Sequence, residues 1–137
     1  MSTILLVDDH AILRDGLKNL FESEGLSDRT LEAGDYAAAL DLLRETTPDA
    51  AVLDINLPGR SGLELLEQIR QRHPNLPVLM LSMHAEEQYG LRALRLGASG
   101  YLSKSCPPEQ LIEGLRQVLA GRRYLTPALS ERLLSAV

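Results

Sequence analysis

The chain has 137 residues, a length that suits one domain with a single core and is too short for two ordinary domains. Its formal net charge is −5, and its basic residues form no cluster larger than the Arg122-Arg123 pair, so it is a poor nucleic-acid binder by itself. No apolar run could span a bilayer, and the first residues lack the basic start of a signal peptide, so we expect a cytoplasmic protein that contacts no membrane. The single cysteine, Cys106, has no disulfide partner.

Short apolar runs alternate along the chain with longer amphipathic stretches. The runs are too short for helices, and several are apolar at every position, which is typical of strands covered on both faces. In chain order they are residues 4–7, 30–33, 50–53, 78–81 and 101–102. This pattern predicts five buried strands.

The amphipathic stretches between these runs have the spacing of helices. In the first stretch, the apolar residues that share one helix face are Leu13, Leu17, Leu20 and Phe21. This spacing predicts that Leu13 belongs to the core. The second stretch, residues 36–45, follows Asp35, whose carboxylate is a typical N-cap.

Start and stop signals mark the later helices. Ser61 with Glu64 three residues on is the pattern of a capping box. A fourth helix is expected over residues 86–96, because Gly97 directly after it is a typical stop signal. Pro108 suits the first turn of a fifth helix, where the missing N–H has no partner in any case.

A strand followed by a helix is thus repeated five times. This order predicts an α/β fold in which a parallel sheet has helices on both faces and right-handed crossovers. Five units are too few for an eightfold barrel and suit a doubly wound open sheet. A short amphipathic piece after residue 120 is expected to be a connector or a docking helix.

Polar side chains follow the predicted strands at one edge of the sheet, where open α/β sheets bind ligands. They are Asp8, Asp9, Asp54, Ser82, Ser103 and Lys104. Three neighbouring carboxylates stay ionised only beside a cation, and hard oxygen ligands favour Mg²⁺ or Mn²⁺. A carboxylate such as Asp54 can act as a nucleophile that forms an aspartyl phosphate, while Lys104 and Ser82 bind phosphoryl oxygens.

Four sequence blocks, in this order, resemble the receiver domains of bacterial response regulators. They are ILLVDDH at residues 4–10, VLDINLPG at 52–59 with Gly62 beyond it, LMLS at 79–82 and GASGYLSK at 97–104. Each block is a weak signal alone, but the four together are specific. The resemblance implies a receiver domain over residues 1–120, with a flavodoxin-like (βα)5 doubly wound sheet of strand order 2-1-3-4-5.

The resemblance also implies a metal site and a phosphoacceptor. Asp54 is expected to accept a phosphoryl group from a phosphohistidine of a sensor histidine kinase. Mg²⁺, or Mn²⁺ in its place, is expected to bind the side chains of Asp9 and Asp54 and the backbone carbonyl of Asn56. Asp8 is expected to act on the metal through water. Such a domain promotes its own phosphorylation and dephosphorylation without being a turnover enzyme.

A switch is implied by the same resemblance. Ser82 and Lys104 are expected to bind the phosphoryl oxygens, and Tyr101 is expected to turn inward as Ser82 moves toward the phosphate. This movement would alter the face formed by the fourth helix, fifth strand and fifth helix. Met83 and His84, at the mouth of the site, are candidates for tuning the phosphoryl lifetime. They also suit an ordinary, partly exposed loop.

The NarL/FixJ class of DNA-binding regulators is the most similar branch of this family. The similarity lies in Asp9-His10 with LRDGL at residues 13–17, and in the tail from Gly121 to Leu134. Residues 121–137 are therefore expected to be a linker or C-terminal helix that leads to a helix-turn-helix output domain absent from this chain; the alternative is a stand-alone receiver. DNA contact would come only through that domain, and phosphorylation could drive formation of a homodimer.

The chain departs from the family pattern at the residue after the lysine. Many receivers have a cis proline after the lysine, whereas this chain has Ser105; a cis bond there would cost about 3–4 kcal/mol, so its isomer is undecided. Ile12 and Leu13, next to the acids, could meet the helices of the kinase.

Four other functions fit the sequence less well. A pseudo-receiver, which binds partners without phosphate, predicts loss of the acids or of Lys104. A haloacid-dehalogenase-type phosphatase needs a second aspartate at the position of Asn56. The Asp-x-His signature of cobalamin-binding domains, here ending in His10, needs glycine where Leu13 stands. An FMN site would require a phosphate-cradling loop in place of the two aspartates after the first strand.

Overall fold

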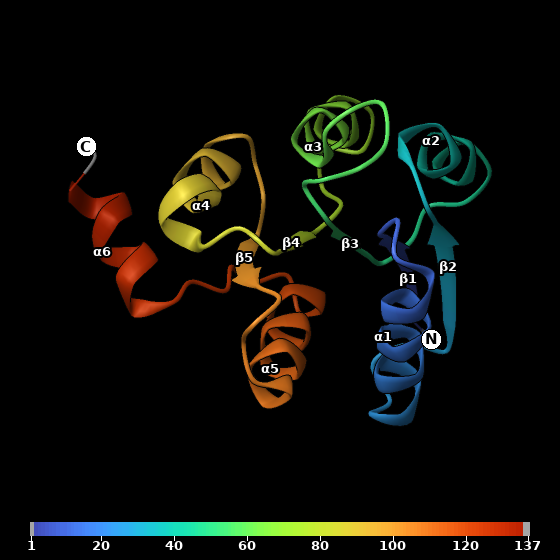
Figure 1. Cartoon of the computed structure of the whole chain (residues 1–137), viewed down its shortest axis with the longest axis horizontal. Coiled ribbons are helices and arrows are strands. Elements are labelled where there is room, and N and C mark those ends of the chain that lie inside the picture. Colours follow the sequence, from blue (N-terminus) through green and yellow to red (C-terminus); the bar gives the residue numbers. More distant parts are fainter. Residues whose placement is uncertain (1, 136–137) are drawn as a thin grey trace.

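The computed structural model describes residues 2–135 and contains one parallel sheet with strand order β2-β1-β3-β4-β5 (Figure 1). Its strands are β1 (Thr3–Val7), β2 (Arg29–Ala33), β3 (Ala50–Leu53), β4 (Val78–Ser82) and β5 (Gly100–Ser103). This order confirms the predicted doubly wound α/β fold. The order reverses at β1, so the loops after β1 and β3 leave the sheet on opposite sides, as expected of a ligand-binding edge.

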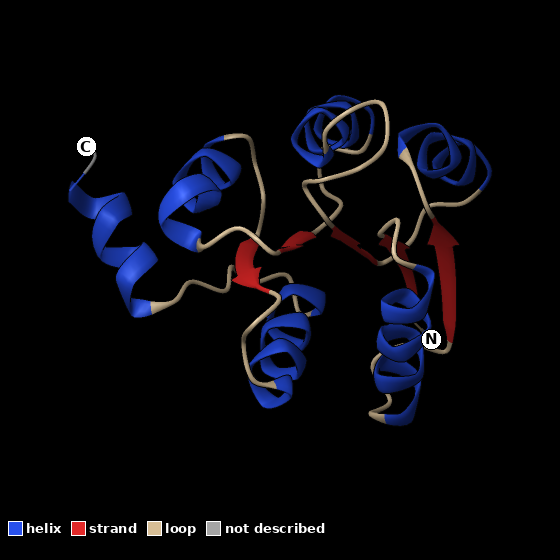
Figure 2. Cartoon of the chain, viewed as in Figure 1, coloured by secondary structure: helices blue, strands red, loops and turns tan. Residues whose placement is uncertain are grey.

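Helices cover both faces of this sheet. They are α1 (Ala11–Ser23), α2 (Tyr36–Glu45), α3 (Gly62–Arg72), α4 (Glu86–Arg95), α5 (Pro108–Leu119) and α6 (Pro127–Ser135). Figures 1 and 2 show α2, α3 and α4 on one face and α1 with α5 on the other, while α6 lies beside α4. Among the described residues, none of these helices is long and apolar enough to cross a bilayer.

The hydrophobic core has two layers, one on each face of the sheet. Leu5 and Val7 of β1 belong to the layer under α2, α3 and α4. Ile4 and Leu6 belong to the layer under α1 and α5. Because alternate residues point to opposite faces, a strand covered on both faces must be apolar throughout, which explains the unbroken runs in the sequence.

The predicted caps are confirmed, and one core prediction is wrong. The side chain of Asp35 accepts a hydrogen bond from the amide of Ala38 at 2.8 Å, and Ser61 forms the expected capping box. Gly97 has a φ of 106°, a left-handed conformation that favours glycine. Leu13, however, is 36% exposed, because burial on α1 begins one turn later, at Leu17.

The tail packs against the body of the domain. The amide of Tyr124 donates to the carbonyl of Ser99 at 2.8 Å, which covers part of β5, the edge strand. Leu129 of α6 is fully buried against Gly90 of α4. The described part of the tail is therefore a docked helix; residues 136–137 lie outside the described residues, and its role as a linker stays a prediction.

Candidate functional site

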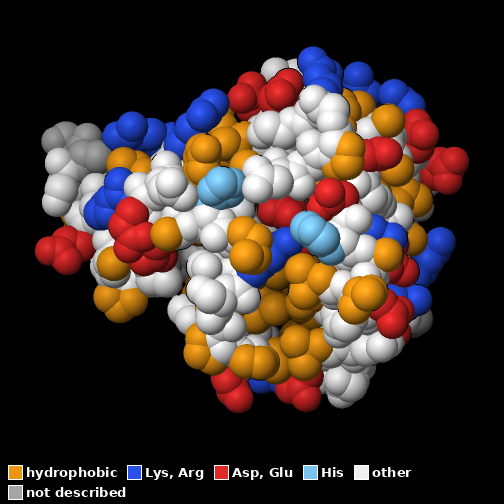
Figure 3. All heavy atoms as spheres, in the orientation of Figure 1, with side chains coloured by type: hydrophobic (Ala, Val, Ile, Leu, Met, Phe, Trp, Pro, Cys, Tyr) orange, Lys and Arg blue, Asp and Glu red, His pale blue; other side chains and the backbone are white. Residues whose placement is uncertain are grey.

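The predicted polar residues meet at the carboxyl ends of four neighbouring strands. Asp8 follows β1, Asp54 follows β3, Ser82 is the last residue of β4 and Lys104 follows β5. Ser103, predicted to follow the fifth strand, belongs to it, since it pairs with Ser82 of β4. Figure 3 views this end and shows acidic, basic and histidine side chains gathered near the centre, beside an apolar hollow.

A buried ammonium group joins two of the carboxylates. The Nζ atom of Lys104 lies 2.6 Å from Asp8 Oδ2 and 2.9 Å from Asp54 Oδ2. The exposed fractions of these side chains are 6% for Lys104 and 3% for each aspartate. Burial alone would lower the pKa of Lys104, but the hydrogen bonds to Asp8 and Asp54 together outweigh it and raise that pKa. Lys104 is therefore a fixed positive charge beside Asp54.

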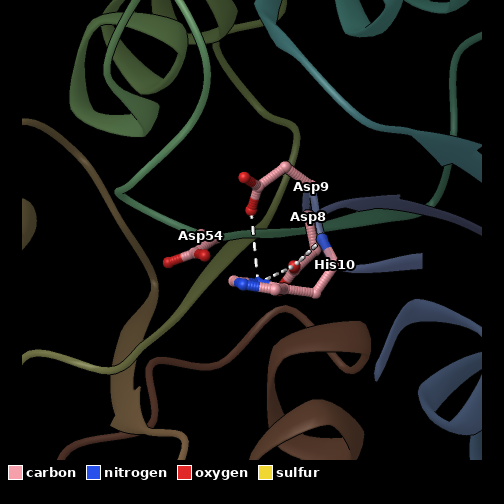
Figure 4. Close-up of side chains that lie close together, drawn as sticks. All are labelled: Asp8, Asp9, His10 and Asp54. Atoms are coloured by element: carbon pink, nitrogen blue, oxygen red, sulfur yellow. Dashed lines mark hydrogen bonds and ion pairs between the residues drawn. The ribbon is translucent and has the colours of Figure 1, made fainter. Parts of the chain in front are cut away.

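Four side chains form a cluster that could hold a metal ion. Ligand atoms of Asp8, Asp9, His10 and Asp54 all lie within 4.8 Å of one another. Figure 4 shows these four side chains gathered together. The first three come from the β1–α1 loop, and Asp54 reaches them from the end of β3. Carboxylate oxygens are the ligands that Mg²⁺ prefers, so the donor set fits a hard divalent cation.

His10 also belongs to this cluster, although the sequence indicated a ligand role for it only in the cobalamin signature. Its Nδ1 atom lies 3.3 Å from both Asp8 Oδ1 and Asp9 Oδ1, and its side chain is 68% exposed. Its place directly after the two acids was the signal that could have identified it. Its imidazole can compete with a cation for the same carboxylate oxygens.

Gly62 positions the backbone of the phosphoacceptor candidate. A Cβ atom at Gly62 would lie 1.8 Å from the carbonyl oxygen of Asp54, a distance that no side chain tolerates. The amide of Gly62 also donates to the carbonyl of Ile55 at 2.7 Å. Glycine at this position lets α3 begin directly against the end of β3.

Ser82, His84 and Tyr101 form a connected group beside Asp54. The Tyr101 hydroxyl donates to the carbonyl of His84 at 2.8 Å, and the His84 amide donates to Ser82 Oγ at 3.2 Å. Tyr101 is fully buried, and this burial raises its pKa to about 12. The side chain points inward here, while its predicted movement with phosphate stays a prediction.

The two candidates for lifetime tuning have different surroundings. His84 Nε2 lies 3.2 Å from Asn56 Oδ1, and its ring meets the Tyr89 ring edge-on at 4.8 Å. The side chain of His84 is thus held over the β3–α3 loop. Met83 is 70% exposed.

Among residues 2–135 no peptide bond is cis, so the bond between Lys104 and Ser105 is trans.

The chain is similar to known response regulators. A family model described as the response regulator receiver domain matches residues 4–116. The transcriptional activator protein ExaE of Pseudomonas putida is 44% identical over 131 residues, which is 95% of this chain and 61% of that protein. The nitrate/nitrite response regulator NarL of Escherichia coli K12 is 35% identical over 136 residues, 99% of this chain and 63% of that protein. This chain thus spans about six-tenths of the length of these relatives.

Solved structures give the same result. A crystal structure of a LuxR-family two-component response regulator from Aurantimonas sp. SI85-9A1 superimposes with a TM-score of 0.89 at 38% identity, covering 99% of this chain and 97% of that one. A CheY-like response regulator receiver domain protein from Methanospirillum hungatei JF-1 gives 0.80 at 28% identity, covering 88% and 94%.

Proposed function

Because the chain belongs to the family of response regulator receiver domains, we propose that it accepts a phosphoryl group on Asp54 from a sensor histidine kinase. Domains of this family are signalling proteins rather than turnover enzymes. The observation that carries the proposal is the position of the Asp54 carboxylate. It is buried, it lies 2.9 Å from the Lys104 ammonium, and it belongs to the cluster of acids at the sheet edge.

We propose that the side chains of Asp9 and Asp54 and the backbone carbonyl of Asn56 hold Mg²⁺, with Mn²⁺ as a substitute. Asp8 would act through a water of the metal, since both of its carboxylate oxygens are already engaged, Oδ2 by Lys104 and Oδ1 by the His10 amide. The metal supplies positive charge that neutralises the acids and the incoming phosphoryl oxygens. The support is a donor set made of carboxylates within reach of one another.

In the transfer, an Asp54 carboxylate oxygen attacks phosphorus as the bond between phosphorus and the kinase histidine nitrogen breaks. The phosphoryl group forms an acyl phosphate with Asp54, and the electron pair of the broken bond stays on the imidazole. Lys104 moves its contact from the Asp54 carboxylate to a phosphoryl oxygen, and the Ser82 hydroxyl donates to another.

The signal then leaves through the segment between Ser82 and α4. We propose that Ser82 pulls this segment toward the phosphate and that Tyr101, bonded to the His84 carbonyl, holds it there. The changed surface is the face of α4, β5 and α5. His84 and Met83 shield the phosphoryl group from water and so lengthen its lifetime; the contact of His84 with Asn56 supports this role for His84.

An exposed residue beside the acidic loop and the named relatives indicate two kinds of partner, a kinase and an output domain. Ile12 is 92% exposed next to the acidic loop, where a kinase helix would approach, and we propose that it makes this contact in the cytoplasm. The relatives include a transcriptional activator. We therefore propose that the tail leads to a DNA-binding output domain in a longer regulator, and that phosphorylation promotes homodimer formation.

Beryllofluoride, a tetrahedral mimic of the phosphoryl group, tests the proposed chemistry at equilibrium. Fluorine NMR of the chain with beryllofluoride and Mg²⁺ should show a bound signal that chelation of the metal removes. The Asp54→Asn variant should show none, because it lacks the carboxylate oxygen that completes the coordination of beryllium. An equal signal from Asp54→Asn would refute Asp54 as the acceptor.

A further inference from the structure

The guanidinium group of Arg14, in the first turn of α1, joins the acidic loop to strand β2. Its Nη1 atom donates to the carbonyl oxygen of Asp8 at 2.6 Å, and its Nε atom donates to Glu32 Oε1 at 3.3 Å. The side chain of Arg14 is 20% exposed and that of Glu32 is 31% exposed. A charged donor therefore clamps the main chain at the point where two metal-site acids follow one another.

The carbonyl that Arg14 holds belongs to the peptide between Asp8 and Asp9. The orientation of this peptide sets the direction in which the Asp9 side chain leaves the main chain. Within the described residues, His10 is the N-cap of α1 but its side chain caps no amide of that helix. The loop has other hydrogen bonds, from the Asp8 amide to Ala33 at 3.0 Å, from the His10 amide to Asp8 Oδ1 at 2.8 Å and from the Arg14 amide to the His10 carbonyl at 2.9 Å. None of these three fixes the carbonyl of Asp8.

We propose that Arg14 is a positioning residue of the metal site, which acts on Asp9 through the Asp8 carbonyl and is itself aligned by Glu32. This inference rests on the proposed function, since it assigns Asp9 to the metal. Arg14 needs the forked geometry of a guanidinium, because one side chain must reach a carbonyl on the loop and a carboxylate on β2. Partners of this kind, one layer outside the ligands, orient the ligands themselves.

Charge and positioning predict opposite effects when Arg14 is replaced. Arg14 is a positive charge beside the acids, so its charge alone repels a divalent cation, and its removal would tighten metal binding. If Arg14 orients Asp9, its removal weakens binding instead. Lys18 provides a matched control, because its Nζ atom lies 3.7 Å from the same Glu32 side chain. Replacing Lys18 removes a nearby positive charge without changing the clamp.

Binding of Mn²⁺, followed by the loss of its free-ion electron paramagnetic resonance signal, measures the effect on the folded chain. We expect the dissociation constant to rise about tenfold or more in Arg14→Met, the scale found for such outer partners. Arg14→Lys should weaken binding too, because an ammonium cannot bridge both acceptors. Glu32→Gln should cause a smaller loss, and Lys18→Met should leave the constant unchanged or slightly lower. Thermal unfolding without metal checks that each variant is folded.

The outcomes separate this inference from the proposed function. A dissociation constant in Arg14→Met equal to or below that of the original chain would overturn the positioning role. If Arg14→Met does not fold, unchanged binding in both Arg14→Lys and Glu32→Gln would overturn it equally. The proposed metal site itself fails if the original chain binds no Mn²⁺, or if Asp9→Asn binds Mn²⁺ as tightly as the original chain. Either result would hold whatever the effect of replacing Arg14.

Discussion

Tyr101 links the chemistry of the site to the core of the domain. Its ring is fully buried, and its hydroxyl donates to the carbonyl of His84, which lies two residues after Ser82. A phenol in this setting is kept neutral, since ionisation would bury a charge near Asp54. A residue that packs like a core aromatic thus also contacts the loop that we propose binds the phosphoryl group.

The raised pKa of Tyr101 predicts how stability changes at alkaline pH. The folded pKa of about 12 lies above the ordinary tyrosine value of about 10. The stabilisation that comes from this difference is complete below pH ~10 and is lost as the pH rises toward ~12, because the unfolded chain ionises first. The loss should reach roughly 2–3 kcal/mol of unfolding free energy.

Urea unfolding of Tyr101→Phe from pH ~9 to ~11.5 checks this expectation. The variant should be less stable below pH ~10, by about 1 kcal/mol for the lost hydrogen bond, and its deficit should shrink or reverse at higher pH. Tyr124→Phe, on the tail, serves as control and should keep the alkaline loss. Parallel curves for the original chain and Tyr101→Phe would contradict the account.

At the scale of elements, α6 is an integral part of the packed structure. It meets α4 at Gly90, where the absence of a side chain lets Leu129 approach closely. The Thr126 hydroxyl donates to Glu86 Oε2 at 2.7 Å and accepts from the amide of Leu129 at 3.2 Å, so the start of α6 is tied to the start of α4. Because α4 follows the segment after Ser82 directly, we expect a change in that segment to reach the tail without an intermediate element.

Truncation of the buried leucine of α6 should therefore cost as much as truncation in an ordinary core. We expect Leu129→Ala to lower the unfolding free energy by about 2–4 kcal/mol, because it leaves a cavity beside Gly90. Leu134→Ala, on the same helix but 76% exposed, should change it by no more than ~0.5 kcal/mol. Equal effects of the two substitutions in chemical denaturation would show that α6 is not docked in solution.

The sequence predicted those elements whose signals are local. Apolar runs identified the strands, and Asp35 and Ser61 marked helix starts, because caps act within one turn. Leu13 was misplaced because helical spacing identifies a face but not where along the helix burial begins. The contact of Arg14 with the Asp8 carbonyl was not predictable either. A long side chain has many acceptors within reach, and only the packing of α1 against β2 selects one.

The same limit applies to the site. Asp8, Asp9, Asp54, Ser82 and Lys104 were all predicted, since parallel strands bring their carboxyl ends to one edge. His10 and Gly62 were not given their roles in advance. The first depends on a loop conformation, and the second on a close approach of α3 to the Asp54 carbonyl that becomes visible only in three dimensions.

Over the whole molecule, the polar site and the tail occupy different parts of the sheet: the site lies along its carboxyl edge and the tail lies beside β5. The acids and Lys104 lie along its carboxyl edge, after β1, β3 and β5, where Asp8 and Asp54 are buried and Asp9 is exposed. The tail lies at the β5 side, far from β2, as Figure 1 shows. We therefore expect phosphorylation of Asp54 to act on the output through β4, β5 and α4, a short path through packed elements.

Mass spectrometry of the intact chain after incubation with acetyl phosphate tests the central claim most directly. With Mg²⁺, the account predicts a gain of one phosphoryl group, which disappears with a chelator and in Asp54→Asn. The same gain in Asp54→Asn would place the acceptor elsewhere. No gain in a folded chain that binds Mn²⁺ would contradict the phosphoacceptor function and favour a domain that binds its partners without phosphorylation.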